Sequence, residues 1–209
     1  MISEKVNVYI NALYAKNDFN KKNYIEASEL KTFGTLVDDD ISRMLQLLAK
    51  ISRPKKVLEI GTSIGYSTIS LAKAIQDYGG KIITIEYDPK SAQQAIKNFE
   101  QAGVAENSEV KIGDANEIIP GMQDNQFDLI FQDVGDKRLY AKLFHHCVRL
   151  LKPGGLLLAE DSLLFMKHNK RPEWTACIQE FNEMVANCPD LESTLLPIGD
   201  GLTIALKKA

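Results

Sequence analysis

The sequence predicts an α/β fold in which a mostly parallel, doubly wound sheet carries helices on both faces. From residue 56 onward, short apolar runs alternate with longer segments of helical periodicity, as expected for parallel strands joined by crossover helices. The chain then ends in two apolar runs separated by a glycine turn, which is typical of an antiparallel hairpin. Its 209 residues, 44% of them apolar, suffice for one domain with a complete core.

The first part of the chain precedes this alternation. Residues 3–15 and 24–32 are weakly patterned helical segments, so we expect residues 1–34 to form an N-terminal helical extension of a core at 35–209. Residues 37–50 are a clearer amphipathic helix. Its apolar stripe consists of Ile41, Met44, Leu45 and Leu48.

The alternating part predicts five parallel strands, and the hairpin adds two, for seven in total. The parallel strands are expected at 56–60, 81–86, 109–113, 127–133 and 155–161. The helices between them are expected at 66–78, 89–102, 114–119 and 138–151. A last helix at 172–187 precedes hairpin strands at 191–198 and 201–208, with Gly199 and Asp200 as the turn.

The most informative stretch joins the first strand to the next helix. Residues 55–68 read KKVLEIGTSIGYST, with Glu59 ending the strand and Gly61 and Gly65 in the turn. Glycines let a backbone approach a ligand closely, and the helix start presents unpaired N–H groups. The spacing matches neither the dinucleotide fingerprint nor the phosphate-gripping loop. An acid before the glycines suits a positively charged cofactor.

Each of the five parallel strands ends in or just before an acid, at the edge where open α/β sheets bind ligands. These acids are Glu59, Glu86, Asp114, Asp133 and Asp161. So many carboxylates at one edge require a positive charge among them. Glu86 has the right reach to bind both ribose hydroxyls of a nucleoside. Asp114 is equally an N-cap or, with Ala115, an adenine contact, and Ser67 is either a helix cap residue or a donor to a cofactor carboxylate.

Composition excludes several other classes. No apolar run reaches the ~20 residues of a membrane span, and the N-terminus lacks a secretory pattern. A net charge of −3 gives no overall attraction to nucleic acid. Three cysteines without a Cys-x-x-Cys pair predict neither disulfides nor a zinc site, so the expected compartment is the cytoplasm.

These residues resemble a known family. EIGTSIGYS at 59–67, FDLIFQD at 127–133, LKPGGLLLAED at 151–161 and PIGDGLTIALKK at 197–208 are similar to the motifs of Rossmann-like class I S-adenosylmethionine-dependent methyltransferases, and in particular of the cation-dependent caffeoyl-CoA and catechol O-methyltransferases. The resemblance covers residues 35–208.

The resemblance implies a role for each matched residue. Glu59, Gly61, Gly65 and Ser67 would bind the methionine and ribose side of S-adenosylmethionine, Glu86 the ribose, Asp114 and Ala115 the adenine, and Asp133 the amino group. Asp133 and Asp161 would bind a divalent cation, with Mg²⁺ preferred over Mn²⁺ or Ca²⁺. A homodimer is also implied.

Two positions depart from the family pattern. Ser162 stands where the family has an asparagine as third metal ligand, although a hydroxyl can also bind Mg²⁺. The family's lysine three residues after the first aspartate is here Lys137, four residues after Asp133. Lys137 is therefore the candidate catalytic base or electrostatic helper.

The predicted reaction is methyl transfer to a hydroxyl of a small catechol-like acceptor, activated by the cation at Asp133, Asp161 and Ser162. One alternative is O-methylation of a hydroxylated tRNA uridine, to which the basic segment 167–171 could contribute. A second alternative is a non-catalytic S-adenosylmethionine-binding protein. Trp174 is either core or part of the substrate wall.

Overall fold

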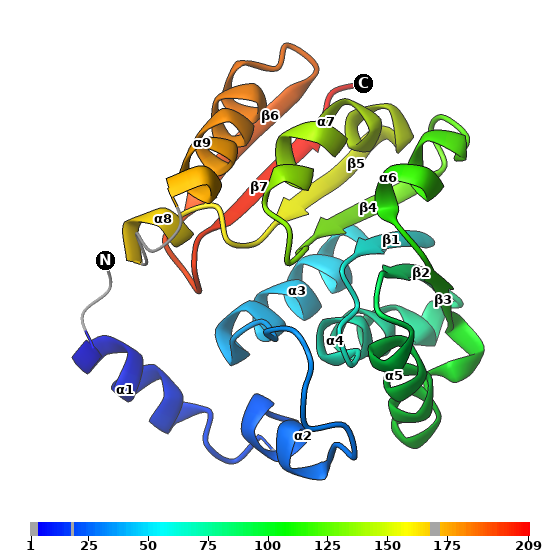
Figure 1. Cartoon of the computed structure of the whole chain (residues 1–209), viewed down its shortest axis with the longest axis vertical. Coiled ribbons are helices and arrows are strands. Elements are labelled where there is room, and N and C mark those ends of the chain that lie inside the picture. Colours follow the sequence, from blue (N-terminus) through cyan, green and yellow to red (C-terminus); the bar gives the residue numbers. More distant parts are fainter. Residues whose placement is uncertain (1–3, 18, 168–171) are drawn as a thin grey trace.

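A seven-stranded sheet forms the centre of the computed structural model, which describes residues 4–17, 19–167 and 172–209 (Figure 1). The strands are β1 (Lys56–Ile60), β2 (Lys81–Glu86), β3 (Ser108–Ile112), β4 (Phe127–Gln132), β5 (Leu151–Ala159), β6 (Leu191–Leu196) and β7 (Leu202–Lys207). Their order is β3-β2-β1-β4-β5-β7-β6. Strands β1 to β5 are parallel, and β7 pairs antiparallel with β5 and β6. The predicted fold class is therefore confirmed.

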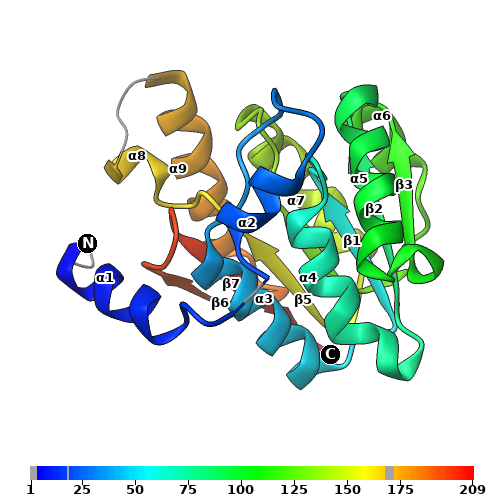
Figure 2. The ribbon, with the colours of Figure 1, turned by 90° about the horizontal axis from the view of Figure 1, so that it is seen from below.

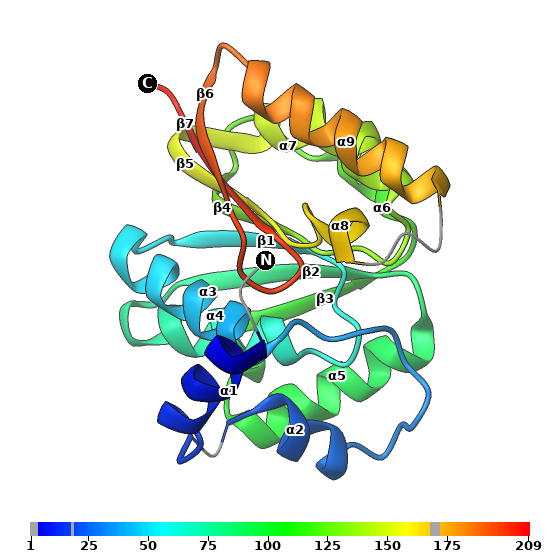
Figure 3. The ribbon, with the colours of Figure 1, turned by 90° about the vertical axis from the view of Figure 1, so that its left-hand side faces the viewer.

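Helices cover both faces of this sheet. The α-helices of the described residues are α1 (Glu4–Leu13), α2 (Lys21–Ala27), α3 (Asp39–Ser52), α4 (Tyr66–Ile75), α5 (Pro89–Ala102), α6 (Ala115–Ile118), α7 (Arg138–Leu150), α8 (Leu164–Lys167) and α9 (Pro172–Asn187), of which α1 does not pack on the sheet. Figure 3 shows α3, α4 and α5 on one face and α7 and α9 on the other. Two hydrophobic cores lie on opposite sides of the sheet. Because side chains alternate along a strand, Val57 packs in one of these cores and Leu58 in the other.

The C-terminal hairpin differs from its prediction. Strand β6 ends at Leu196 and β7 begins at its partner Leu202. The connection is therefore the five residues 197–201 and not Gly199 and Asp200 alone. The loop is longer because it packs on the chain after β5. The N–H of Leu163 donates to Asp200 O (2.7 Å), and that of Ser162 donates to Gly201 O (3.0 Å).

Strand β5 also begins earlier than predicted. Leu151 already pairs with Phe127, and the register shifts before Leu156 pairs with Leu129. Gly154, at φ 78°, lies within this irregular stretch. The Pro-Gly-Gly sequence is therefore a distortion inside the strand and not a turn before it.

The N-terminal segment is attached to the core through α2 and its flanking residues. The Tyr24 hydroxyl donates to Ile64 O (2.6 Å), and the rings of Phe19 and Tyr66 stack with centroids 4.9 Å apart. Helix α1 lies at the edge of the molecule, apart from the sheet, with Val8 and Tyr9 exposed (Figure 2). Among the described residues, no helix is long and apolar enough to cross a membrane.

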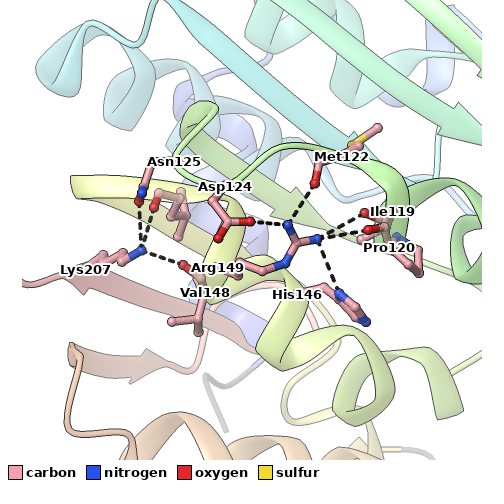
Figure 4. Close-up of polar contacts among 10 residues, drawn as sticks. Ile119, Pro120, Met122, Asp124, Asn125, His146, Val148, Arg149 and Lys207 are labelled. Carbon is pink, nitrogen blue, oxygen red and sulfur yellow. Dashed lines mark hydrogen bonds and ion pairs between the residues drawn. The ribbon is translucent and has the colours of Figure 1, made fainter.

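Two basic residues consolidate the end of the sheet where the parallel strands begin (Figure 4). The Arg149 guanidinium, at the end of α7, pairs with Asp124 and donates to Met122 O (2.8 Å). The Lys207 amine donates to Val148 O (2.9 Å), one of the last carbonyls of α7. These contacts join the loop before β4 to α7, far from the acidic strand ends.

Candidate active site

The glycine loop after β1 lies against the end of β4. Gly61 has φ 102° and Gly65 has φ 92°, backbone angles that residues with a side chain rarely adopt. A Cβ on Gly61 would lie 1.9 Å from the carbonyl oxygen of Asp133, so this close approach requires glycine. Helix α4 starts directly after Gly65, as the sequence predicted.

A cavity of about 680 Å³ opens beside this loop at the carboxyl ends of β1, β2, β3 and β4. Most of the predicted cofactor residues line it, namely Gly61, Ser67, Glu86, Asp114, Ala115 and Asp133. Its position agrees with the rule that open α/β sheets bind ligands at this edge. The cavity is large enough for a nucleoside with an amino acid side arm.

Glu86 connects the end of β2 to the glycine loop. One carboxylate oxygen accepts the N–H groups of Thr62 (3.2 Å) and Ser63 (2.6 Å), and the other accepts that of Asp88 (2.9 Å). A carboxylate has about four acceptor sites, so room remains for a ligand hydroxyl. Glu86 therefore holds the loop and faces the cavity at once.

Asp114 combines the two roles that the sequence left open. It is the N-cap of α6, since its carboxylate accepts the N–H of Asn116 (2.8 Å), and it also lines the cavity beside Ala115. The capping geometry fixes the carboxylate at the cavity wall. An adenine contact remains a prediction.

Glu59 lies beneath the site and does not line the cavity. Its side chain is completely buried, and one oxygen accepts hydrogen bonds from Thr68 on α4 and Thr84 on β2 (2.7 Å for the latter). The other oxygen has no hydrogen-bond partner among the described residues. Burial raises the pKa of Glu59 to about 7, while the side chains of Ser67, Thr68 and Thr84 act to lower this pKa. A direct contact with cofactor stays a prediction.

A second cavity of about 400 Å³ adjoins the first, and Asp133 lines both. Its walls include Lys21, Lys137, Glu160 and Asp161 together with apolar side chains. Trp174 lines this second cavity, and its part in a substrate wall stays a prediction. The hairpin residue Asp200 also reaches its wall.

Three carboxylates converge where the cavities meet. Asp133, Glu160 and Asp161 each present an oxygen within 4.8 Å of the others. Sequence reasoning did not identify Glu160, because neighbouring residues of a strand point to opposite faces. Strand β5 has already ended at Ala159, and Asp161 adopts φ 64°, so that alternation no longer applies. The signal in the sequence that could have identified Glu160 was the pair of adjacent acids, Glu160 and Asp161, directly after the strand.

Lys137 is the counter-ion of this carboxylate group. Its amine forms an ion pair with Asp161 and donates to Val134 O (2.6 Å), and the side chain is only 4% exposed. The extra residue in the loop after Asp133 thus does not remove the lysine from the site. Burial raises the pKa of Asp133, while the nearby Lys137 charge opposes this change. Burial and the carboxylates of Asp133 and Asp161 raise the pKa of Glu160.

Ser162, predicted as the third metal ligand, faces away from this group. Its hydroxyl donates to Ala159 O (3.1 Å) and forms a 2.8 Å hydrogen bond with the Thr203 hydroxyl on β7. The side chain is completely buried. The described geometry therefore gives no support to Ser162 as a ligand, whereas Glu160 joins Asp133 and Asp161 in the carboxylate group.

Comparison with known proteins places the chain in a family. The family model described as O-methyltransferase matches residues 17–208. A catechol O-methyltransferase from Niastella koreensis is 34% identical over 183 residues, which cover 82% of each chain. A caffeoyl-CoA O-methyltransferase from Stellaria longipes is 25% identical and covers 96% of this chain and 89% of that one.

A solved structure agrees with these relatives. The O-methyltransferase TomG from Streptomyces achromogenes, in complex with SAM, superposes with a TM-score of 0.76 at 26% identity over 100% of both chains. The match spans the glycine loop, the acidic strand ends and the terminal hairpin. The chain thus belongs to the O-methyltransferase family and is a methyltransferase enzyme.

Proposed function

We propose that this enzyme transfers the methyl group of S-adenosylmethionine to a hydroxyl of a small catechol-like acceptor. The observation that supports this most directly is the pair of adjoining cavities with Asp133 in their shared wall. A donor in the first cavity and an acceptor in the second would meet at this residue. Methyl transfer needs such an alignment of acceptor oxygen, methyl group and sulfur.

The first cavity fits the proposed donor. Glu86 can accept the ribose hydroxyls, and Asp114 and Ala115 can flank the adenine. Gly61 and Ser67 line the same cavity, where they can contact the methionine arm. The acidic rim balances the positive sulfonium.

The second cavity fits a small aromatic acceptor. Phe165 and Trp174 offer ring surfaces, and Asp133, Glu160 and Asp161 offer polar contacts at the inner end. Two adjacent hydroxyls could bind there at the same time. Cavities of this kind, with apolar walls and a few convergent polar groups, are typical of small-molecule sites.

The donor set also fits the divalent cation that the family resemblance implies. Three carboxyl groups lie close together beside one ammonium, and oxygen ligands of this kind favour Mg²⁺, Mn²⁺ or Ca²⁺. Asp133, Glu160 and Asp161 would hold the ion, with Glu160 in the role predicted for Ser162. When bound, such an ion lowers the pKa of a hydroxyl and orients it.

The chain's own residues account for the remaining steps. Asp133 lies in the wall shared by the two cavities, and in the absence of an ion burial raises the pKa of its carboxyl, which makes it a candidate acceptor for the hydroxyl proton. The new carbon–oxygen bond forms as the carbon–sulfur bond breaks, leaving a neutral thioether. Lys137 donates to two oxygens, so its described position favours the electrostatic role over that of a base.

Labelled S-adenosylmethionine distinguishes the competing functions. We expect label in a catechol, and loss of transfer in Asp133→Asn with retained binding of S-adenosylhomocysteine. Label in hypomodified tRNA would favour the tRNA alternative. Residues 168–171 of the basic segment 167–171, on which that alternative depends, lie outside the described residues. Cofactor binding without transfer to either acceptor would indicate the non-catalytic alternative. No binding of S-adenosylmethionine would refute the proposal.

The cation, the dimer and the compartment need separate measurements. Chelation is expected to lower the rate, and Asp161→Ala should abolish the response to added Mg²⁺. Light scattering of the purified chain tests the implied homodimer. The cytoplasmic location stays a prediction, to be tested by fractionation.

A further inference from the structure

We propose that two threonine hydroxyls are positioning groups that connect the buried carboxyl of Glu59 to the carboxylate of Glu86 in the wall of the donor cavity. They belong to Thr84 on β2 and to Thr62 in the glycine loop. The inference rests on the proposed function, since it concerns how the same cavity holds the ribose of the donor. It gives Glu59 an effect on the cofactor without any contact with it.

The connection starts between two neighbouring strands. Glu59 on β1 and Thr84 on β2 are partners in the register of the sheet, so their side chains lie side by side on one face. The Thr84 hydroxyl donates to a carboxyl oxygen of Glu59 (2.7 Å) and lies 2.5 Å from the Thr62 hydroxyl. All three residues are at most 1% exposed, so water does not compete for these hydrogen bonds.

The donor and acceptor roles along this connection follow from the hydroxyl groups themselves. A threonine hydroxyl has a single hydrogen. Thr84 gives its hydrogen to Glu59, so its oxygen can only accept, and Thr62 must donate to it. Because threonine is branched at Cβ, this hydrogen bond also restricts the side-chain rotamer of Thr62. The loop residue is therefore held from inside the fold.

The same loop residue contacts the carboxylate that lines the donor cavity. The backbone N–H of Thr62 donates to a Glu86 oxygen (3.2 Å), and the N–H of Ser63 donates to the same oxygen (2.6 Å). A hydroxyl that fixes Thr62 on its inner side therefore also aims this N–H at Glu86. The orientation of Glu86 thus depends on Glu59, an acid outside the lining of the cavity.

The burial of Glu59 agrees with a positioning role. A carboxyl group in a protein core costs free energy, and apolar side chains of similar volume would pack there without this cost. The Glu59 oxygen that accepts from Thr84 on β2 also accepts from Thr68 on α4. The acid thus joins the helix that follows the glycine loop to the strand that carries Glu86.

Calorimetric titration of the full-length protein tests the connection without any turnover. S-adenosylhomocysteine and an analogue of it that lacks both ribose hydroxyls are titrated into the wild type, Thr84→Val and Thr84→Ser. We expect Thr84→Val to bind S-adenosylhomocysteine about tenfold more weakly, because valine keeps the shape of threonine but not its hydroxyl. The analogue should lose much less affinity, since it has no hydroxyl for Glu86 to accept. Thr84→Ser keeps the side-chain hydroxyl and should stay close to the wild type.

A matched control removes the other hydroxyl from the same Glu59 oxygen. Thr68 on α4 is as buried as Thr84 and also donates to Glu59, but it does not line the donor cavity. Thr68→Val should therefore lower the free energy of unfolding as Thr84→Val does, and weaken S-adenosylhomocysteine binding much less. Equal losses of affinity in the two variants would overturn the inference, because a general disturbance around Glu59 would then explain them.

The two threonines should also behave as one unit. Thr62→Val removes the partner hydroxyl, so the double variant with Thr84→Val should lose no more affinity than the larger single loss. Additive losses would show that the two hydroxyls act separately, against the inference. If Thr84→Val does not fold, Thr62→Val opens the connection at its other end and carries the same expectation for both ligands.

The remaining outcomes separate this inference from the proposed function. An unchanged affinity in Thr84→Val, or equal losses for both ligands, overturns the inference and leaves the donor cavity as proposed. A wild type that binds both ligands equally well overturns the ribose role of Glu86 and the inference with it, while methyl transfer to a catechol would still stand. A wild type that binds neither ligand overturns the proposed function as well.

Discussion

The buried carboxyl of Glu59 should make the stability of this enzyme depend on pH in a defined direction. Its pKa is about 7 in the folded chain and 4.5 when exposed, because burial penalises the charged form. Between these values the folded state holds a proton that the unfolded chain has released. The free energy of unfolding therefore falls as pH rises from about 4.5 to about 7 and changes no further above that.

The magnitude follows from the difference between the two pKa values. The two pKa values differ by about 2.5, and each pKa unit corresponds to about 1.36 kcal/mol. The free energy of unfolding should therefore fall by at most about 3 kcal/mol across this window. Glu59→Gln cannot titrate, so its unfolding free energy should lack this part of the decline. Its absolute stability is a separate matter, because the amide must satisfy the hydrogen bonds from Thr68 and Thr84.

Urea denaturation at intervals between pH 4.5 and 8 measures this slope. The curve of the wild type minus that of Glu59→Gln should fall by about 2–3 kcal/mol between pH 5 and 7. Glu192→Gln removes an exposed carboxyl on β6 and should keep the slope of the wild type. Parallel curves for the wild type and Glu59→Gln would refute the reasoning, since Glu59 would then not hold its proton in the folded state.

Three further predictions concern the loop, the cofactor and the opposite end of the sheet. Gly61→Ala should abolish the binding of S-adenosylhomocysteine measured by calorimetry, because the added Cβ meets Asp133 O. The control Gly121→Ala, whose Cβ would have no atom within 4 Å, should bind normally. Equal binding by the two variants would contradict the predicted clash. Glu86→Ala should weaken that binding about tenfold or more in a chain that still melts cooperatively, and unchanged affinity would exclude the ribose role. Arg149→Ala should lower the free energy of unfolding in urea by about 1–3 kcal/mol without changing that affinity; an unchanged midpoint would show that its contacts add nothing to stability.

Local patterns sufficed to predict that the seven strands and the glycine loop exist, although the bounds of β5 and of the hairpin strands differ. The runs 56–60 and 81–86, which are mostly apolar, matched β1 and β2 to the residue, because a parallel strand covered on both faces buries consecutive side chains. The loop at Gly61 was predictable for a similar reason, since only glycine fits its backbone. The edge at which Glu86, Asp114 and Asp133 gather followed from the parallel topology.

The roles of the polar side chains depended on contacts between distant segments. Ser162 and Glu160 are two residues apart, yet a hydrogen bond to Thr203 on β7 turns the first away, and the backbone at Asp161 brings the second to the site. Lys137 could be counted in the sequence, but its ion pair with Asp161 spans two strand ends. The amino-acid sequence by itself thus determined the approximate positions of the strands along the chain, the glycine turn and the acids of the site edge, because these depend on local periodicity and backbone freedom. Only the tertiary structure decided which of those polar groups face one another, because hydrogen bonds between separate strands set each side chain's direction.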